Sequence, residues 1–142
     1  METKTAEPNF LVNANYVTTK ADLDAVKLTT IRNKIKAEGD YLEFYAYGFK
    51  CQVKRNCGLA LLGYITVPAS YNIDLSVLDF HCGVTWEERY SDVTVLGFDC
   101  NHGGDYVPLA TYGHSTDVRD YCTMKYVMKR LRNSARGLYN LN

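Results

Sequence analysis

The feature that most constrains the fold is an apolar run at residues 93–98 that passes directly into a polar, glycine-bearing segment at residues 99–105, Asp-Cys-Asn-His-Gly-Gly-Asp. A short apolar run of this kind predicts a buried β-strand. Upstream, a second polar segment at residues 81–83 opens another predicted strand at residues 80–86. Reactive side chains at strand ends, with glycines that let a ligand approach the backbone, are typical of a binding or catalytic site.

The rest of the pattern predicts an α+β fold in a single domain of 142 residues. We expect a helix at residues 18–38, ended by Gly39, and an antiparallel sheet of two hairpins with four to six strands over residues 41–99. A site loop at residues 100–115 and a second helix at residues 116–136, starting at Thr116, complete the outline. Residues 1–17 are expected to form an arm or an edge strand.

Charge and cysteine content exclude some functions. The net charge is 0, which argues against general nucleic-acid binding. The basic residues concentrated near the C-terminus fit the end of a helix dipole and a solvated face better than a phosphate site. The five cysteines form no CxxC pair, and neither a secretory signal nor a membrane-spanning stretch is evident, so we expect free thiols, a cytoplasmic location and no zinc finger.

Four segments, residues 48–56, 63–68, 81–86 and 97–105, resemble in sequence and order an uncharacterised family of small bacteriophage and prophage proteins. The resemblance covers residues 45–130. Family members often carry His-Gly-Gly where this chain has His81-Cys82-Gly83. The resemblance implies a phage accessory protein expressed in a bacterial cytoplasm, and it implies no particular chemistry.

The polar segments could hold a metal ion. The candidate ligands are His81, Asp99, His102 and Asp105, with Cys100 as a further possibility, and zinc or manganese would suit them. The alternative is that the aspartates cap turns while His102 bonds a carbonyl. A Cys100–His pair could also form a thiolate nucleophile, although a cysteine after a buried strand is more often inert packing.

A small-ligand pocket is the third interpretation. Gly103 and Gly104 could offer backbone N–H groups to an anion. Aromatic rings could stack a base, and the candidates are Tyr64, Tyr71, Trp86, Tyr106 and Tyr112. Three arginines could pair with phosphate, Arg55, Arg89 and Arg119. The alternative is that the rings pack the sheet and the arginines are solvated.

Together these patterns favour a protein that acts by binding, without a required cofactor. We expect it to sequester a nucleotide-type small molecule near His81, Asp99, His102 and Asp105, to counter a host defence system, and to form a homo-oligomer. One alternative is a metal-dependent nucleotide hydrolase that uses the same residues as ligands. The other is a direct protein inhibitor of a host defence enzyme that binds through tyrosine and arginine side chains.

Overall fold

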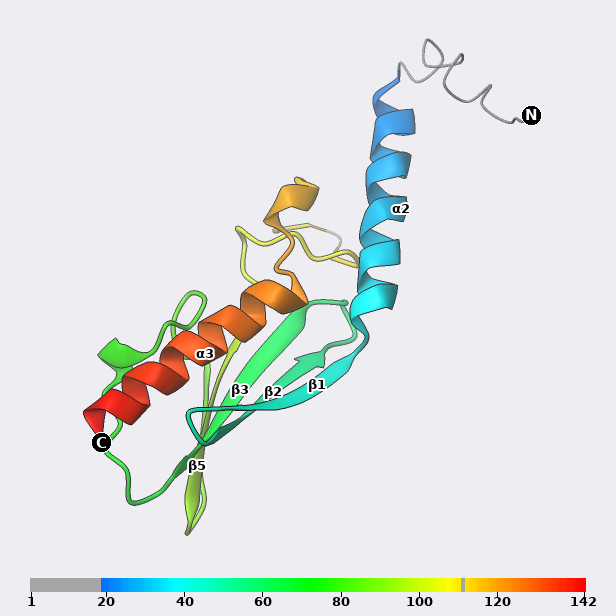
Figure 1. Ribbon diagram of the computed structural model, residues 1–142. Coiled ribbons are helices and arrows are strands. Elements are labelled where there is room, and N and C mark those ends of the chain that lie inside the picture. The colour runs from blue at the N-terminus through cyan, green and yellow to red at the C-terminus, as the bar shows by residue number, and fades with distance from the viewer. Residues whose placement is uncertain (1–18, 111) are drawn as a thin grey trace, which may run out of the picture. The chain divides into compact units, whose positions relative to one another are not determined.

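The computed structural model describes residues 19–110 and 112–142, so the predicted arm or edge strand at residues 1–17 lies outside the described residues (Figure 1). The chain divides into two compact units, residues 1–34 and 35–142. Helix α2 (Lys20–Glu38) crosses this boundary, and its extent agrees with the helix predicted at residues 18–38. The sheet, the site and the second helix all lie in the second unit.

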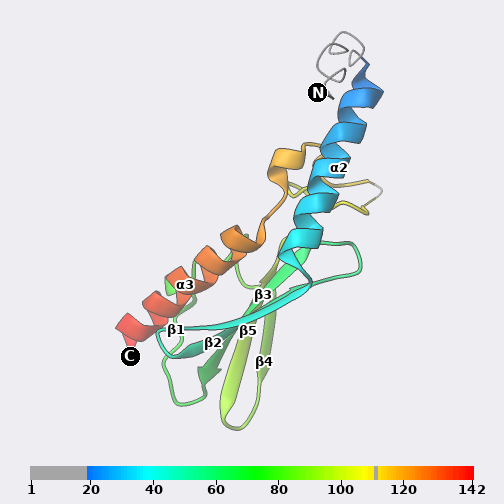
Figure 2. The same cartoon turned by 45° about the vertical axis from the view of Figure 1, so that its right-hand side comes forward.

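The second unit contains one five-stranded antiparallel sheet, as Figure 2 shows from a second direction. Its strands lie in the order β1-β2-β3-β5-β4, and their bounds are β1 Tyr41–Ala46, β2 Phe49–Arg55, β3 Leu61–Pro68, β4 Trp86–Arg89 and β5 Val93–Asp99. Helix α3 (Met124–Leu141) follows the sheet in the chain. The predicted α+β fold, with an antiparallel sheet between an N-terminal and a C-terminal helix, is therefore confirmed.

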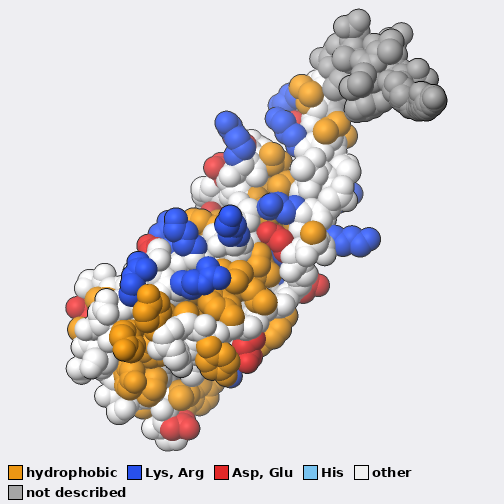
Figure 3. All heavy atoms as spheres, viewed as in Figure 1, with side chains coloured by type: hydrophobic (Ala, Val, Ile, Leu, Met, Phe, Trp, Pro, Cys, Tyr) orange, Lys and Arg blue, Asp and Glu red, His pale blue; other side chains and the backbone are white. Residues whose placement is uncertain are grey.

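The core lies between α3 and one face of the sheet. Alternate residues of β2, β3 and β5 are buried on this face, including Val53, Leu61 and Ile65. Helix α3 contacts β1, β2 and β3 and buries one stripe of its own, Val127, Leu131, Ala135 and Leu138. This spacing of three and four residues places one side of a helix against the core, and exposed Lys and Arg side chains gather on the other side of α3 (Figure 3).

The strand predicted at residues 80–86 was wrong for most of its length, because β4 begins only at Trp86. Cys82 and Gly83 both have positive φ values, 58° and 86°, which place them in the left-handed region and not in a strand. His81 therefore lies in a turn, and the short β4 pairs with β5 as an edge hairpin.

The start predicted for the second helix was also wrong. Residues Val118–Asp120 form a separate 3-10 helix, η3, because the Asp117 side chain accepts a hydrogen bond from the Arg119 backbone N–H and closes a short turn. Tyr121 is then extended, and α3 begins after Thr123, whose hydroxyl accepts from the Tyr126 N–H as an N-cap. The helix continues past residue 136 to Leu141.

Helix α3 closely approaches the 3-10 helix η2 (Leu75–Val77) at Gly137, so we expect alanine at this position to lower the stability of the protein. Gly137→Ala would normally favour a helix, yet a Cβ at Gly137 would lie 2.5 Å from the Val77 carbonyl oxygen. We expect this variant to lose about 1–3 kcal/mol of unfolding free energy in urea denaturation. Asn140→Ala, at an exposed position of the same helix, is the control and should be neutral or slightly stabilising. Equal stability of Gly137→Ala and wild type would contradict the packing described.

Candidate functional site

His81 is the first side chain of the site, and both of its ring nitrogens are engaged. Phe80, directly before it, is buried against Phe98 with ring centroids 4.8 Å apart, which anchors the turn. The His81 Nε2 atom lies 2.7 Å from Asp105 Oδ1, and Nδ1 lies 2.8 Å from the Tyr126 hydroxyl. The ring is therefore held in one orientation by partners from two distant segments.

Asp105 is a buried carboxylate with only 3% of its surface exposed. Its Oδ2 atom accepts a hydrogen bond from the His102 backbone N–H at 2.9 Å, and its own N–H donates to the His102 carbonyl oxygen. Its Oδ1 atom also accepts from the Cys122 thiol at 3.5 Å. These contacts offset the cost of burying the carboxylate and close the turn over residues 102–105.

His102 and Asp99 lie beside this pair. The His102 Nδ1 atom is 3.3 Å from Asp99 Oδ1 and 3.4 Å from Asp105 Oδ2. This nitrogen is buried without a hydrogen-bond partner among the described residues. The Asp99 carboxylate accepts from the Thr85 hydroxyl and the Asn101 N–H, as predicted for an aspartate that stabilises a turn. The structure thus brings together His81, Asp99, His102 and Asp105, the four residues that the sequence grouped.

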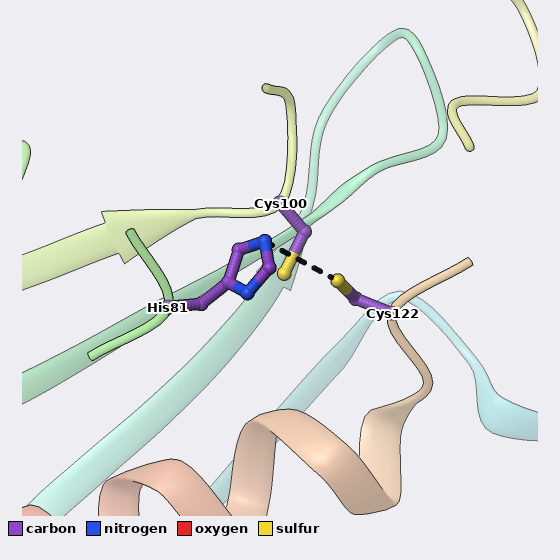
Figure 4. Close-up of side chains that lie close together, drawn as sticks. All are labelled: His81, Cys100 and Cys122. Atoms are coloured by element: carbon purple, nitrogen blue, oxygen red, sulfur yellow. Dashed lines mark hydrogen bonds between the residues drawn. The ribbon is translucent and has the colours of Figure 1, made fainter. Parts of the chain in front are cut away.

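Two cysteines complete the site, as Figure 4 shows. The metal-ligating atoms of His81, Cys100 and Cys122 lie within 4.8 Å of one another, and those of His81, Cys82 and His102 form a second such group. Cys122 is not among the residues predicted from the sequence, because it lies 22 positions after Cys100 with no motif between them. The hydrogen bond to Cys122 and burial raise the pKa of the Cys100 thiol, so a thiolate nucleophile at Cys100 is disfavoured.

A pocket of about 410 Å³ opens beside these side chains. Among the residues predicted to bind a ligand, His81, Gly104, Asp105 and Arg119 line it. The other lining residues come from the segment that leads into α3 and from its first turn: Asp120, Tyr121, Cys122, Thr123 and Tyr126. Its volume is in the range of small-molecule sites.

Arg55 has a different role from the one predicted. Its side chain is 1% exposed, and its guanidinium donates to the carbonyl oxygens of Gly39 and Leu59 and to the Tyr121 hydroxyl. It also pairs with Glu38 and Asp40, at 3.3 and 3.1 Å. Since each guanidinium nitrogen is already bonded inside the protein, Arg55 does not serve as a phosphate partner.

Tyr64 and Trp86 lie away from the pocket. Gly97 on β5 is the cross-strand partner of Tyr64 on β3 and of Trp86 on β4. Both side chains therefore lie on the face of the sheet opposite Phe98 and the core. The Tyr64 ring covers Gly97, where an added Cβ would meet it at 2.7 Å, and Lys54 stands over the same ring at 5.4 Å. Tyr64 therefore packs on the sheet, which is the alternative given for it above. Gly103 is also absent from the pocket lining.

No family model, curated protein or solved structure matched the chain. The phage-family resemblance accordingly stays a prediction. Within residues 19–110 and 112–142, no helix is both long enough and apolar enough to cross a membrane.

Glu38 supports the pocket wall and can be tested. Its Oε1 atom accepts from the Tyr121 hydroxyl at 2.6 Å and from Arg55, while Oε2 accepts from the Met124 N–H at the start of α3. We expect Glu38→Gln to lose about 3 kcal/mol of unfolding free energy in urea, because it leaves the buried Arg55 without its main counter-charge. Glu43→Gln, at an exposed position on β1, should lose almost nothing. Equal losses of unfolding free energy in the two variants would show that Glu38 does not support the pocket wall.

Proposed function

We propose that this chain is a phage accessory protein that acts by binding, sequestering a nucleotide-type small molecule to counter a host defence system. The observation that carries the proposal is the pocket, which gathers four of the residues expected to bind a ligand, His81, Gly104, Asp105 and Arg119. The phage and cytoplasmic parts of the proposal rest on the sequence resemblance, and the expected homo-oligomer rests on the small size of the sheet-and-helix unit.

The lining of the pocket suits the parts of a nucleotide. Arg119 offers a guanidinium that Asp117 holds in place through paired contacts at 3.1 and 2.7 Å, and it can meet a phosphate. Asp120 offers carboxylate oxygens to ribose hydroxyls or base N–H groups. Tyr121 and Tyr126 supply aromatic surface for a base or sugar.

The side chains that could catalyse a reaction are already bonded within the protein, which favours binding over turnover. The His81 imidazole and the Asp105 carboxylate are bonded to each other and to neighbouring side chains, and the pKa of the Cys100 thiol is raised by its bond to Cys122 and by burial. A general base or a nucleophile needs a free, reactive atom aimed at the substrate. The His81 and Asp105 side chains instead bond each other and form part of the pocket wall.

A second candidate function, direct inhibition of a host protein, is favoured by an aromatic surface made of Tyr45, Tyr47, Tyr71 and Tyr139. All four side chains are exposed, and Tyr47 and Tyr139 lie with ring centroids 5.6 Å apart. Tyr45, Tyr47 and Tyr71 line a hollow of about 230 Å³. Exposed tyrosines of this kind are frequent anchors in protein interfaces.

Arg119 gives a direct test of the ligand proposal. Native mass spectrometry of the protein purified from bacteria, before and after denaturation, should detect a released ligand of nucleotide mass. Arg119→Ala should release at least about tenfold less, since it removes a charge-assisted contact to phosphate. Arg89→Ala is a matched control, because Arg89 is also exposed and pairs with an acidic residue two positions earlier, Glu87. A wild-type protein that carries and binds no nucleotide would contradict the proposal.

The aromatic surface predicts a different result for the second candidate. If the protein inhibits a host protein directly, a purified host target should bind the wild type in a pull-down, and Tyr47→Ser combined with Tyr139→Ser should weaken binding by about 2 kcal/mol or more. Tyr90→Ser, at an exposed tyrosine outside this surface, should bind as the wild type does. Loss of target binding in Arg119→Ala alone would contradict this interface.

A further inference from the structure

The side chains around His81 have the composition of a metal centre. One ring nitrogen of His81, Cys100 Sγ and Cys122 Sγ lie within 4.8 Å of one another, and Asp105 Oδ1 lies 2.7 Å from His81 Nε2 and 3.5 Å from Cys122 Sγ. The geometry points to one zinc ion bound by these four residues, through two sulfurs, one imidazole nitrogen and Asp105 Oδ1. This ligand set differs from the His/Asp set that the sequence suggested, because both sulfurs replace Asp99 and His102.

The distances around Cys122 fit a tetrahedral site. Zinc bonds of about 2.3 Å to sulfur and about 2.0 Å to nitrogen or oxygen give edges of about 3.5 Å between a sulfur and an oxygen or nitrogen ligand. The Cys122 Sγ atom is 3.7 Å from His81 Nε2 and 3.5 Å from Asp105 Oδ1. The 2.7 Å between His81 Nε2 and Asp105 Oδ1 is shorter than the edge of about 3.3 Å between such ligands, so these two would separate slightly around the ion.

Charge and proton balance favour the ion. Cys100, Cys122 and Asp105 are all buried, and their two thiols and one carboxylate are groups that bind zinc in proteins. A zinc ion displaces the protons of Cys100 and Cys122, which pass to the solvent, and forms two Zn–S bonds with the thiolates. Its double positive charge then faces two thiolates and the Asp105 carboxylate.

Hydrogen bonds from outside the ligand set fix which atoms of His81 and Asp105 are available to zinc. The Tyr126 hydroxyl lies 2.8 Å from His81 Nδ1, so a proton on Nδ1 leaves Nε2 free to bind the ion. The His102 backbone N–H bonds Asp105 Oδ2, which leaves Oδ1 for the ion. Such outer partners fix the tautomer of a ligating histidine and the rotation of a ligating carboxylate.

The proposed ion would act as a structural cross-link. With four protein ligands it keeps no open position for a water molecule, as in structural zinc sites. It ties together the turn at His81, the end of β5 at Cys100, the turn at Asp105 and the extended segment at Cys122. The inference goes beyond the proposed ligand-binding function, because the ion binds whether or not the pocket holds a nucleotide.

The test is zinc content and cobalt spectroscopy of the full chain. Protein expressed with added zinc should carry one zinc ion per chain by native mass spectrometry and elemental analysis. Cobalt(II) exchanged into the site should show thiolate-to-cobalt charge transfer and the intense d–d bands of a tetrahedral site. Removal of zinc with EDTA should lower the melting temperature. Zinc-free protein that takes up no cobalt, or an isolated protein with a Cys100–Cys122 disulfide, would overturn the proposal.

Variants identify the ligands. Cys100→Ser and Cys122→Ser should each weaken zinc binding by more than the roughly 100-fold seen when outer partners are lost, while Cys57→Ser, at an exposed cysteine, should keep full binding. Tyr126→Phe, a mild change, should weaken binding by about tenfold and keep the cobalt spectrum tetrahedral. Zinc that depends on Cys82 and His102 instead, or that survives in Cys100→Ser, would overturn the ligand set. Nucleotide release is measured separately, so failure of one proposal is distinguishable from failure of the other.

Discussion

The buried carboxylate of Asp105 is the interaction on which the rest of the site depends. Its two oxygens join the turn at residues 102–105 to His81 and to Cys122, which come from three separate parts of the chain. A carboxylate in a water-poor interior is stable only when hydrogen bonds or charges satisfy it. Satisfying Asp105 therefore forces these segments together, and the pocket and the sulfur-rich cluster form around it.

A second buried network supports another part of the pocket lining, at Tyr121 and the start of α3. Glu38 receives hydrogen bonds from Tyr121 and from the first N–H of α3, while Arg55 links it to the turn carbonyl of Gly39 and to Leu59. The end of α2 and the start of α3 are thus tied by one charged pair. Because the Glu38–Arg55 pair is shielded from water, its removal should lower the stability of the protein and also displace Tyr121 in the pocket wall.

The pocket and the proposed zinc site share residues without competing for the same atoms. His81, Asp105 and Cys122 line the pocket, yet the atoms assigned to zinc are those that face one another within the cluster. The groups left for a small molecule are Arg119, Asp120 and the tyrosine rings. A protein built in this way would use the metal to hold the wall and the exposed groups to recognise the ligand, so binding would not require turnover at the ion.

The sequence by itself determined the α+β class, the helix before the sheet, the buried strand before Asp99 and the clustering of His81, Asp99, His102 and Asp105, because hydrophobic period and local composition act over a few residues. Only the tertiary structure decided that Arg55 is an internal ion-pair residue, that Tyr64 covers Gly97, and that Cys122 joins the site. The turn at Cys82 and the late start of α3 were also missed. The turn depends on a positive φ at Cys82, and the start of α3 depends on side-chain hydrogen bonds of Asp117 and Thr123, and none of these leaves a periodic signal in the sequence.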